Sequence, residues 1–501
     1  MGIVASVFKK FHGGVHPVEH KNLSEHCAIE SMPVPKLLVV PLHQHLGAPS
    51  ELVVKVGDKV LKGDLLGSAS GFISAAIHAP TSGTITAIQE HVVGHPSGLT
   101  MPCVIMEPDG EDRWNPQLKG VANPLSLEPS VVRDQVKAAG IVGLGGATFP
   151  SFVKLTPPRD KAVELLLINA VECEPYLTCD ARLMEERPQE VVDGIRIMLH
   201  ALQTRQCIIG IENNKPRAIA AMERAVSGEA GVRVVSLPVM YPQGSEKQLI
   251  EVITGRQVPS RGLPVDIGVI VHNVATAVAV RDAVQLGHPL VSRVVTVTGH
   301  GITRSANIEV LIGTTVDDVI AHCGGLKPGT SKVVMGGPMM GLALHQTNVP
   351  VVKGTSGLLA LTSDDSLEKQ EQPCIRCGNC TNVCPMRLVP CTMAWFAKTD
   401  QIDKLVGVDL LECVECGTCS YVCPSNVPLV HYFRYGKLAV QAKDRERNKA
   451  ELTRQRARSR DERLAREKEA KERKKEEMQA KMAAKRKLDK EAAEQTKIKD
   501  T

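Results

Sequence analysis

The sequence predicts a multidomain α/β protein that begins with a β-rich region and ends with a helical, cysteine-rich region. At 501 residues it is longer than one hydrophobic core usually serves. Apolar runs alternate with helix-like stretches in its middle, as they do in α/β domains. Near its end one cysteine motif occurs twice, as CIRCGNCTNVCP (374–385) and CVECGTCSYVCP (413–424). We expect segments at 1–35, 36–110, 120–290, 291–345, 365–438 and 439–501.

The composition is that of a globular chain that is neither secreted nor membrane-spanning. Hydrophobic residues make up 43%, yet no apolar run approaches the roughly 20 residues that a membrane-spanning helix needs. The N-terminus, MGIVASVFKKFHGG, lacks a sustained apolar core and a small-residue cleavage site, so we expect no secretory signal. Without export we expect the chain to lie in the cytosol, where thiols stay reduced. The 15 cysteines therefore do not indicate a disulfide framework.

The first two segments differ in character. Residues 1–35 are irregular and rich in histidine, as in FHGGVHP, and we expect a docking arm. In 36–110, short apolar runs broken by Gly and Pro predict strands and turns. VKVGDKVLKGDLLG (54–67) and IHAPTSGTITAI (77–88) resemble the halves of a lipoyl- or biotinyl-type barrel-sandwich domain. The turn between them, SASGFISAA, has no lysine to modify, so we expect a structural role.

The next two segments mix strands and helices. VELLLINA (163–170), QCIIGIE (206–212) and VDIGVIVHN (265–273) predict buried strands of a Rossmann-like α/β domain. Segment 291–345 predicts strand, turn, strand and helix, and it resembles the small β-grasp soluble-ligand-binding domain.

Each cysteine motif has the form C-x₂-C-x₂-C-x₃-C-P, which supplies soft thiolate ligands for a [4Fe–4S] cluster. In two-cluster ferredoxins the fourth cysteine of each motif binds the other cluster. We therefore expect one ligand set to be Cys374, Cys377, Cys380 and Cys423, and the other to be Cys384, Cys413, Cys416 and Cys419. Zinc and disulfides fit the spacing less well. The helix-like linker LVPCTMAWFAKTDQIDKLVG predicts a helical ferredoxin-type domain over 365–438, in which Cys391 is a packing residue.

A glycine-rich loop, GIVGLGGATFPSFVKL, spans 140–155. Such loops let backbone N–H groups approach a phosphate or a planar ring. The dinucleotide fingerprint G-x-G-x-x-G is not matched, so the loop alone is a weak signal.

The loop resembles the flavin and NADH loop of the flavoprotein subunit of respiratory complex I, of the form G-R-G-G-A-G-F-P-T-G-x-K-W. The motifs NAVECEP (169–175), YPQGSEKQLIEVITGR (241–256) and HNVATAV (272–278) follow in that family's order. The resemblance implies non-covalent FMN, with NADH as substrate. The residues that it places at the nucleotide and flavin are Gly143, Gly145, Gly146, Phe149, Lys154, Asn169, Glu172, Glu174, Tyr241, Gly244, Glu246, Asn273 and Thr276. Its candidate catalytic residues are Lys154, Glu172 and Glu174.

Among the positions at which the chain departs from that family's pattern, four matter for the expected site. Leu144 stands in place of an arginine, Val171 of an aspartate, Cys173 of a glycine and Ser245 of a glutamate. Loss of a charge at Leu144 would weaken binding of the dinucleotide while sparing FMN. We expect Cys173 to be a packing residue rather than a redox thiol.

The order of domains over about 8–438 resembles the RnfC family, a component of the Rnf ion-translocating electron-transport complex. That family implies a peripheral subunit on the cytoplasmic face of the bacterial inner membrane. Its partners would be membrane-embedded subunits, NAD(H) and ferredoxin-type or quinone-type carriers, and no nucleic acid. Two alternatives remain open. One is an electron-relay or scaffold subunit without NADH oxidation of its own, and the other is a soluble flavoprotein module of an NADH-linked hydrogenase or formate dehydrogenase.

The tail, 439–501, is dense in charges of both signs. From residue 441 it holds 22 Lys and Arg against 14 Asp and Glu. It predicts a solvated helix or a disordered extension, with contact to anionic lipid as an alternative. Mixed charge without aromatic residues makes nucleic-acid binding a poor fit.

Overall fold

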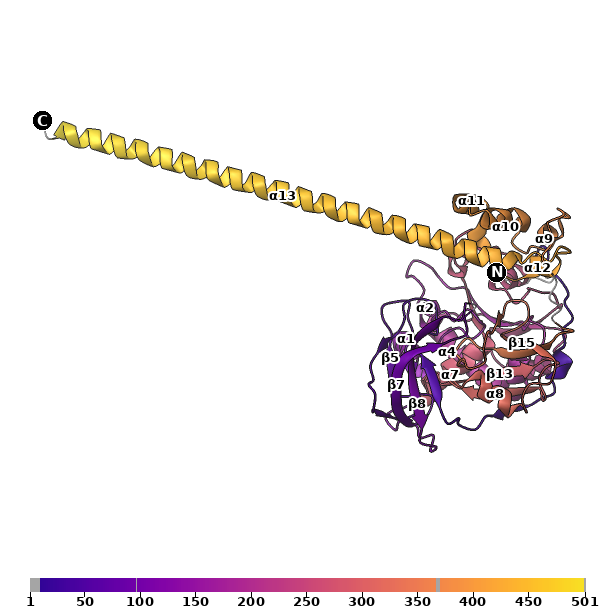
Figure 1. Ribbon diagram of the computed structural model, residues 1–501. Helices are drawn as coiled ribbons and strands as arrows, with labels where there is room; N and C mark the ends of the chain where they lie inside the picture. Colours follow the sequence, from indigo (N-terminus) through magenta and orange to yellow (C-terminus); the bar gives the residue numbers. More distant parts are fainter. Residues whose placement is uncertain (1–9, 96, 366–369, 500–501) are drawn as a thin grey trace.

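The computed structural model describes residues 10–95, 97–365 and 370–499. Residues 1–9 of the expected arm, 366–369 of the cysteine-rich segment and 500–501 of the tail therefore lie outside the described residues. Four packed regions form one body, from which a single long helix projects (Figure 1).

Two antiparallel sheets form the N-terminal domain, with strand orders β2-β8-β7-β4 and β3-β5-β6. Leu66 and Ile77 of the smaller sheet share one core with Leu38, Ile85 and Met106 of the larger. This two-sheet arrangement agrees with the strands and turns that the sequence predicts. The strands are β2 (Leu38–Pro41), β3 (Glu51–Leu52), β4 (Lys59–Val60), β5 (Leu65–Ser68), β6 (Ile77–His78), β7 (Gly83–Val92) and β8 (Thr100–Pro108).

The central domain is built on a parallel sheet of order β11-β10-β9-β12. Its strands are β9 (Leu165–Ala170), β10 (Cys207–Glu212), β11 (Val232–Leu237) and β12 (Val269–Asn273). Three of them coincide with the predicted apolar runs. The exception is the start of the third run, where Pro264–Ile267 forms a 3-10 helix that ends at Gly268, whose φ is 72°.

Helices cover both faces of this sheet because side chains alternate along each strand. Leu166 and Ile168 pack into a core shared with α1, α4 and α7, while Leu165 and Leu167 pack toward α6. The helices are α1 (Pro129–Ala138), α2 (Ser151–Lys154), α3 (Cys179–Glu186), α4 (Pro188–Leu202), α5 (Pro216–Ala225), α6 (Glu246–Thr254) and α7 (Val274–Arg281).

The third domain contains a six-stranded mixed sheet of order β1-β14-β13-β17-β15-β16, with helix α8 (Val316–His322). Two of its strands come from outside the segment that the sequence suggests. β1 (Ile29–Ser31) belongs to the N-terminal arm, and β17 (Gly357–Thr362) lies beyond residue 345. A three-residue strand is too short for a hydrophobic period to reveal it. The other strands are β13 (Ser292–Thr298), β14 (Ala306–Leu311), β15 (Thr330–Met335) and β16 (Leu342–Ala343).

The cysteine-rich domain is helical, as its linker predicts. Short helices follow each motif's central glycine, where Gly378 and Gly417 have φ of 80° and 83°. The core between them includes Met393, Leu405 and Phe433. The helices are α9 (Asn379–Asn382), α10 (Pro390–Lys398), α11 (Ile402–Gly407), α12 (Thr418–Tyr421) and the start of α13 (Leu429–Lys499).

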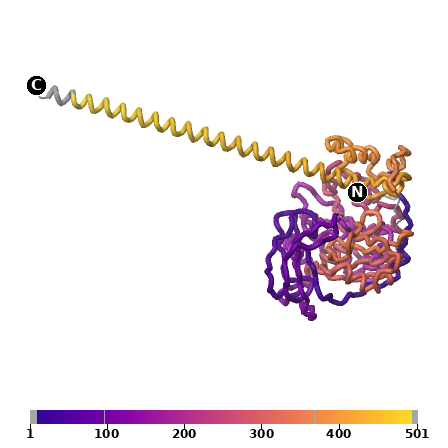
Figure 2. Tube along the Cα trace, viewed as in Figure 1, coloured from indigo at the N-terminus to yellow at the C-terminus, as the bar shows by residue number. Residues whose placement is uncertain are grey.

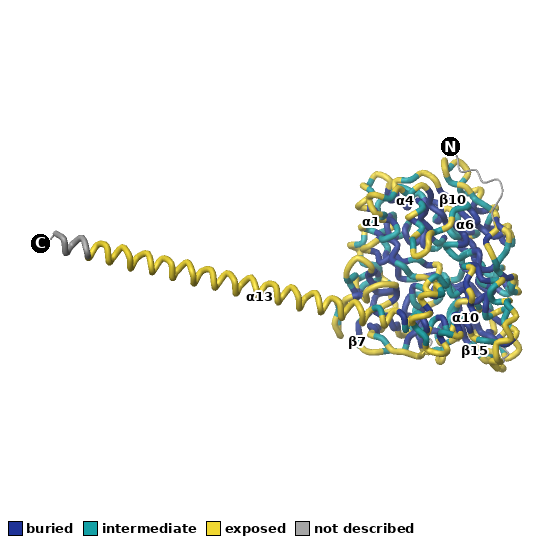
Figure 3. Tube along the Cα trace, turned by 90° about the horizontal axis from the view of Figure 1, so that it is seen from above, coloured by how far each residue is buried: buried dark blue, intermediate teal, exposed yellow. Residues whose placement is uncertain are grey.

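Helix α13 is 71 residues long and carries the charged tail away from the body (Figures 1 and 3). Its side chains are exposed from Arg445 to Ala493. Of the two expectations for the tail, the solvated helix agrees with this structure. Among the described residues, no helix combines the length and the apolar character needed to cross a membrane.

The N-terminal arm runs over the body from the cysteine-rich helices to the barrel (Figure 2). Gly14 N–H donates to the carbonyl of Val383 in the first cysteine motif, at 3.0 Å. Val15 pairs with Tyr241 of the central domain, with N···O distances of 2.8 and 3.0 Å. The arm therefore joins domains that lie far apart along the chain.

Candidate functional site

Residues from four of the motifs meet at the carboxyl end of the parallel sheet, where open α/β folds usually bind ligands. Asn169 and Asn273 are register partners at the ends of β9 and β12. Asn169 Nδ2 donates to the carbonyl of Gly244 at 2.7 Å. The Asn273 side chain accepts from Ala275 N–H at 2.9 Å and so caps α7.

The glycine loop lies against the start of α7. Leu144 N–H donates to Thr276 Oγ1 at 2.9 Å. A Cβ at Gly145 would lie 3.2 Å from Cβ of Asn273, which favours a glycine there. Gly146 has a φ of 108° and faces open space, while Gly143 N–H donates to the carbonyl of Phe149 at 2.8 Å. Of these three glycines only Gly146 faces open space, so a planar or phosphate-bearing group could approach the loop at this position.

Lys154 reaches across this edge to α6. Its Nζ donates to Glu246 Oε1 at 2.6 Å and to the carbonyl of Val271 at 3.0 Å. Both side chains are partly exposed. The geometry therefore places an accessible cation and its carboxylate partner next to the glycine loop.

Glu172 follows β9 and is 7% exposed. Its Oε1 accepts from Asp180 N–H at 2.9 Å, whereas Oε2 has no hydrogen-bond partner among the described residues. A buried carboxylate oxygen without a donor is costly, so this atom fits a contact with a bound group.

Asp180 connects Glu172 to Asn273, and no motif in the sequence pointed to it. Its Oδ2 accepts from Asn273 Nδ2 at 2.6 Å. Burial, together with neighbouring Glu172, raises the pKa of Asp180 to about 7. Its only signal in the sequence is an acidic residue in the first turn of α3.

Glu174 and Tyr241 lie at the junction with the other two domains. The Glu174 carboxylate accepts from the N–H groups of Met339 and Met340, at 3.1 and 2.9 Å, and lies 3.4 Å from the Tyr241 hydroxyl. Burial raises the pKa of Glu174 to about 7. The Tyr241 hydroxyl has a single proton, and its shorter contact, at 2.6 Å, is the one that it donates to the carbonyl of Cys416. These two residues therefore adjoin the second cysteine motif.

Cys173 fits the expected packing role. It lies in the apolar core beside Tyr241. Its Sγ accepts from Gly244 N–H at 3.3 Å, and burial raises the pKa of its thiol well above the ordinary value.

One predicted ligand set lines a single small cavity of the helical domain. Its four members come from both motifs: Cys384, Cys413, Cys416 and Cys419. Burial raises the pKa of Cys413 to about 11, while backbone N–H groups donate to its sulfur and to that of Cys384 at 3.4 Å. Converging thiols with N–H donors to sulfur fit an iron–sulfur cluster.

The other predicted set is more open. Cys374 and Cys377 are exposed, and Cys380 and Cys423 are half-buried. Cys423 Sγ accepts from Val427 N–H at 3.4 Å, which repeats the contact between Leu388 N–H and Cys384 Sγ. Cys391, which we expect to be a packing residue, lies beside Cys380. Burial of Cys380, and then the neighbouring Cys391 thiol, raises the pKa of Cys380.

The relatives of this chain are components of ion-translocating redox complexes. It is 51% identical over 428 residues to the component designated C of the "Ion-translocating oxidoreductase complex" of Rhodobacter capsulatus, covering 85% of this chain and 82% of that one. The chain belongs to this family, the RnfC family. The corresponding component of the "Proton-translocating ferredoxin:NAD(+) oxidoreductase complex" of Clostridium ljungdahlii is 45% identical over 445 residues, covering 89% of this chain and 96% of that one. An RnfC-family relative from Pseudomonas aeruginosa is 43% identical, and the match covers 93% of this chain but 60% of that longer one.

Four domain families match this member of the RnfC family. They are the RnfC barrel sandwich hybrid domain at 9–111, the Nuo51 FMN-binding domain at 136–282, the SLBB domain at 294–343 and the 4Fe-4S dicluster domain at 373–427. The predicted multidomain architecture, FMN and the [4Fe–4S] clusters are thereby confirmed. The protein is a redox subunit of an ion-translocating complex.

A crystal structure of an NAD⁺-reducing [NiFe]-hydrogenase also aligns with this RnfC-family protein, at a TM-score of 0.47 and 21% identity over 63% of each chain. A likeness at that level is too weak to carry an argument about the site.

Proposed function

We propose that this RnfC-family protein exchanges electrons with NAD(H) at the edge of the parallel sheet and holds its two [4Fe–4S] clusters with crossed ligand sets. The observation that carries the proposal is the 2.6 Å hydrogen bond from Tyr241 to the carbonyl of Cys416. It joins the flavin-domain motifs directly to a cysteine motif. A protein that moves electrons from a nucleotide to an iron–sulfur cluster needs these two sites side by side.

The nucleotide site would use the predicted residues in three ways. The small glycines of the loop admit a ring or a phosphate, while Glu172 Oε2 and the amides of Asn169 and Asn273 orient it. A bound flavin supplies the chemistry of accepting a hydride and releasing single electrons. Lys154 would turn from Glu246 toward an anionic dinucleotide, because its ammonium is accessible.

The departure at Leu144 leaves the shape of the glycine loop intact. The Leu144 side chain is 4% exposed and packs in the main core of the central domain. Its backbone N–H still binds Thr276. An arginine is therefore not needed to hold the loop. The charge that it would add for a dinucleotide is absent, and Lys154, which matches the lysine of the family's pattern, is a partly exposed cation in the same motif.

The ligand sets would be crossed as the spacing predicts. The cavity that Cys384 shares with Cys413, Cys416 and Cys419 supports this assignment for one cluster. The repeated N–H···S contacts at Cys384 and Cys423 support it for the other, since both fourth cysteines have the same local geometry.

Membership of the RnfC family supports a proposal for the partners and the location. We propose that the protein docks peripherally on membrane-embedded subunits at the cytoplasmic face of the bacterial inner membrane. NAD(H) and a ferredoxin-type carrier would be its redox partners, since the name of the Clostridium ljungdahlii relative gives both for that complex.

Anaerobic reduction tests this proposal. The purified protein, with FMN and clusters reconstituted, is mixed with NADH alone, and flavin bleaching and the EPR signal of reduced clusters are followed. We expect both to respond. If only dithionite reduces the clusters, the protein is a relay that is supplied by another subunit, and the proposed NADH site is wrong.

A further inference from the structure

Lys21 of the N-terminal arm is buried beneath the loop that carries Glu172 and Glu174. Its Nζ donates to the carbonyls of Glu172, Glu174 and Leu177, at 2.8, 3.0 and 2.7 Å. An ammonium group has three donors, and all three are used here. The arm and the loop are about 150 residues apart in the sequence.

Other arm residues hold the same loop. Tyr176 N–H donates to the carbonyl of Glu19 at 2.7 Å. The His20 ring stacks on the Tyr176 ring, with centroids 4.5 Å apart. Ser24 Oγ lies 2.8 Å from Thr178 Oγ1 and 3.4 Å from the carbonyl of Tyr176. Much of the polar backbone of residues 172–177 is thus satisfied by the arm.

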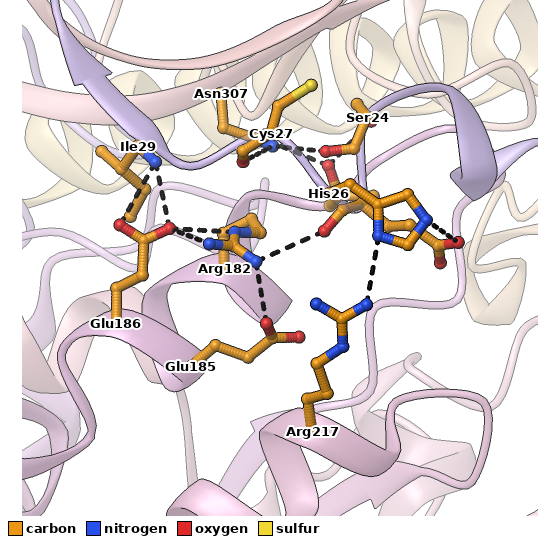
Figure 4. Close-up of polar contacts among 11 residues, drawn as sticks. Ser24, His26, Cys27, Ile29, Arg182, Glu185, Glu186, Arg217 and Asn307 are labelled. Carbon is orange, nitrogen blue, oxygen red and sulfur yellow. Dashed lines mark hydrogen bonds and ion pairs between the residues drawn. The ribbon is translucent and has the colours of Figure 1, made fainter.

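The part of the arm that follows Lys21 is held by residues of the central and third domains (Figure 4). Asn307 of β14 donates to the carbonyls of Ser24 and Cys27, at 3.0 and 3.1 Å. Ile29 N–H donates to Glu186 Oε1 of α3 at 3.0 Å, and Arg182 binds the same carboxylate. Because β1 also pairs with β14, Lys21 projects from a rigid segment.

A second buried cation lies close to the first. Lys215 Nζ donates to Glu212 Oε2 at 2.7 Å and lies 3.5 Å from the carbonyl of Glu172. Burial, then the charge of Lys215, lowers the pKa of Lys21. Burying an ammonium group costs free energy unless it is hydrogen-bonded. Here the backbone carbonyls of the loop provide these hydrogen bonds.

We propose that Lys21 is a positioning residue of the flavin- and nucleotide-binding site, acting through the backbone of residues 172–177 on the carboxylates of Glu172 and Glu174. This inference rests on the proposed function. Removing the ammonium leaves the carbonyls of Glu174 and Leu177 without this donor and the carbonyl of Glu172 with only the 3.5 Å contact to Lys215 Nζ. An unsatisfied buried acceptor is costly, so we expect the loop to move. The carboxylates of Glu172 and Glu174, which this loop carries, would then move away from the positions that the proposed site needs.

The test compares Lys21→Met with Lys327→Met, which removes an exposed lysine from the third domain. Three quantities are measured: the dissociation constant of FMN, hydrogen exchange of the amides of residues 172–178 in the FMN-free protein, and the iron and sulfide content. For Lys21→Met we expect the dissociation constant of FMN to rise by about tenfold or more, which corresponds to the loss of about one buried hydrogen bond. We also expect faster hydrogen exchange of the loop amides. Cluster content stays at the wild-type level, Lys21→Arg recovers part of the FMN affinity, and Lys327→Met matches the wild type.

Lys21→Met with wild-type FMN affinity and wild-type loop exchange would overturn the inference and leave the proposed site intact. If Lys21→Met does not fold, Lys21→Gln, whose amide still donates twice, is measured in the same way, and wild-type values for it overturn the inference too. If the wild type itself binds no FMN, the proposed site fails, and the role of Lys21 fails with it.

Discussion

The Tyr241 hydroxyl donates to the carbonyl of Cys416 at 2.6 Å, and both residues are buried in one apolar cluster with Val15. Tyr241 begins the motif that leads into α6, while Cys416 is the second cysteine of the second cluster motif. The bond therefore joins the two functional halves of the protein. Because Val15 of the arm pairs with Tyr241, the arm supports this junction as well.

Tyr241→Phe tests the junction. The substitution removes one hydroxyl and leaves the buried carbonyl of Cys416 without its donor, which costs about 1–2 kcal/mol of stability. We expect slower reduction of the clusters by NADH, measured by stopped-flow absorbance, and unchanged reduction by dithionite. Tyr435→Phe, whose hydroxyl bonds exposed Asp400, is the matched control. Equal NADH-driven rates in both variants would show that the junction does not matter for electron transfer.

Cys384→Ser tests the crossed ligand sets. The cavity that Cys384 shares with residues of the second motif predicts loss of the cluster held by Cys413, Cys416 and Cys419. Iron content and the EPR spectrum of the reduced protein measure the loss. Cys391→Ser, which changes a cysteine outside both sets, should keep both clusters. If Cys384→Ser instead removes the signal that Cys374→Ser also removes, the assignment is wrong.

Much of this fold could be predicted because its signals are local. The strands β9, β10 and β12 are apolar runs between turn residues, and the two cysteine motifs carry their ligands at fixed spacing. The helix-like linker between the motifs gives α10 and α11. Patterns of this kind lie within one segment, where periodicity and spacing are visible.

The contacts that the sequence could not reveal join distant segments. Lys21 reaches backbone carbonyls, which leave no pattern of residue types. β1 and β17 complete a sheet whose other strands lie elsewhere in the chain. The motifs predict Glu174 and Tyr241 as site residues, yet their position beside the cysteine domain depends on how the domains pack.

Lys154→Ala tests the nucleotide site. Lys154 is an accessible cation beside the glycine loop, and loss of a charge-assisted contact to an anionic dinucleotide should raise KM for NADH by about tenfold to a hundredfold. Dithionite reduction of the clusters should be unchanged. Lys161→Ala, in the same domain and paired with Asp266, serves as the control. If KM responds equally in both variants, Lys154 does not contact the nucleotide.

Glu174 makes the stability of the protein depend on pH. Burial raises its pKa from 4.5 to about 7, so the folded state binds a proton that the unfolded state releases between these values. Stability from this group is therefore largest below about pH 4.5 and is lost as pH rises through about 7.

Glu174→Gln tests this dependence, because it carries no charge. The Met339 and Met340 N–H groups bind different oxygens of the carboxylate, so the single amide oxygen of the glutamine keeps an acceptor for one of them. We expect it to raise the thermal midpoint at about pH 8, where the buried carboxylate costs on the order of 1–3 kcal/mol, and not at about pH 5. Differential scanning fluorimetry across this range measures the effect. Glu223→Gln, which removes one negative charge from an exposed position of α5, controls for a simple change of net charge. An equal gain at both pH values would mean that Glu174 is not the titrating group.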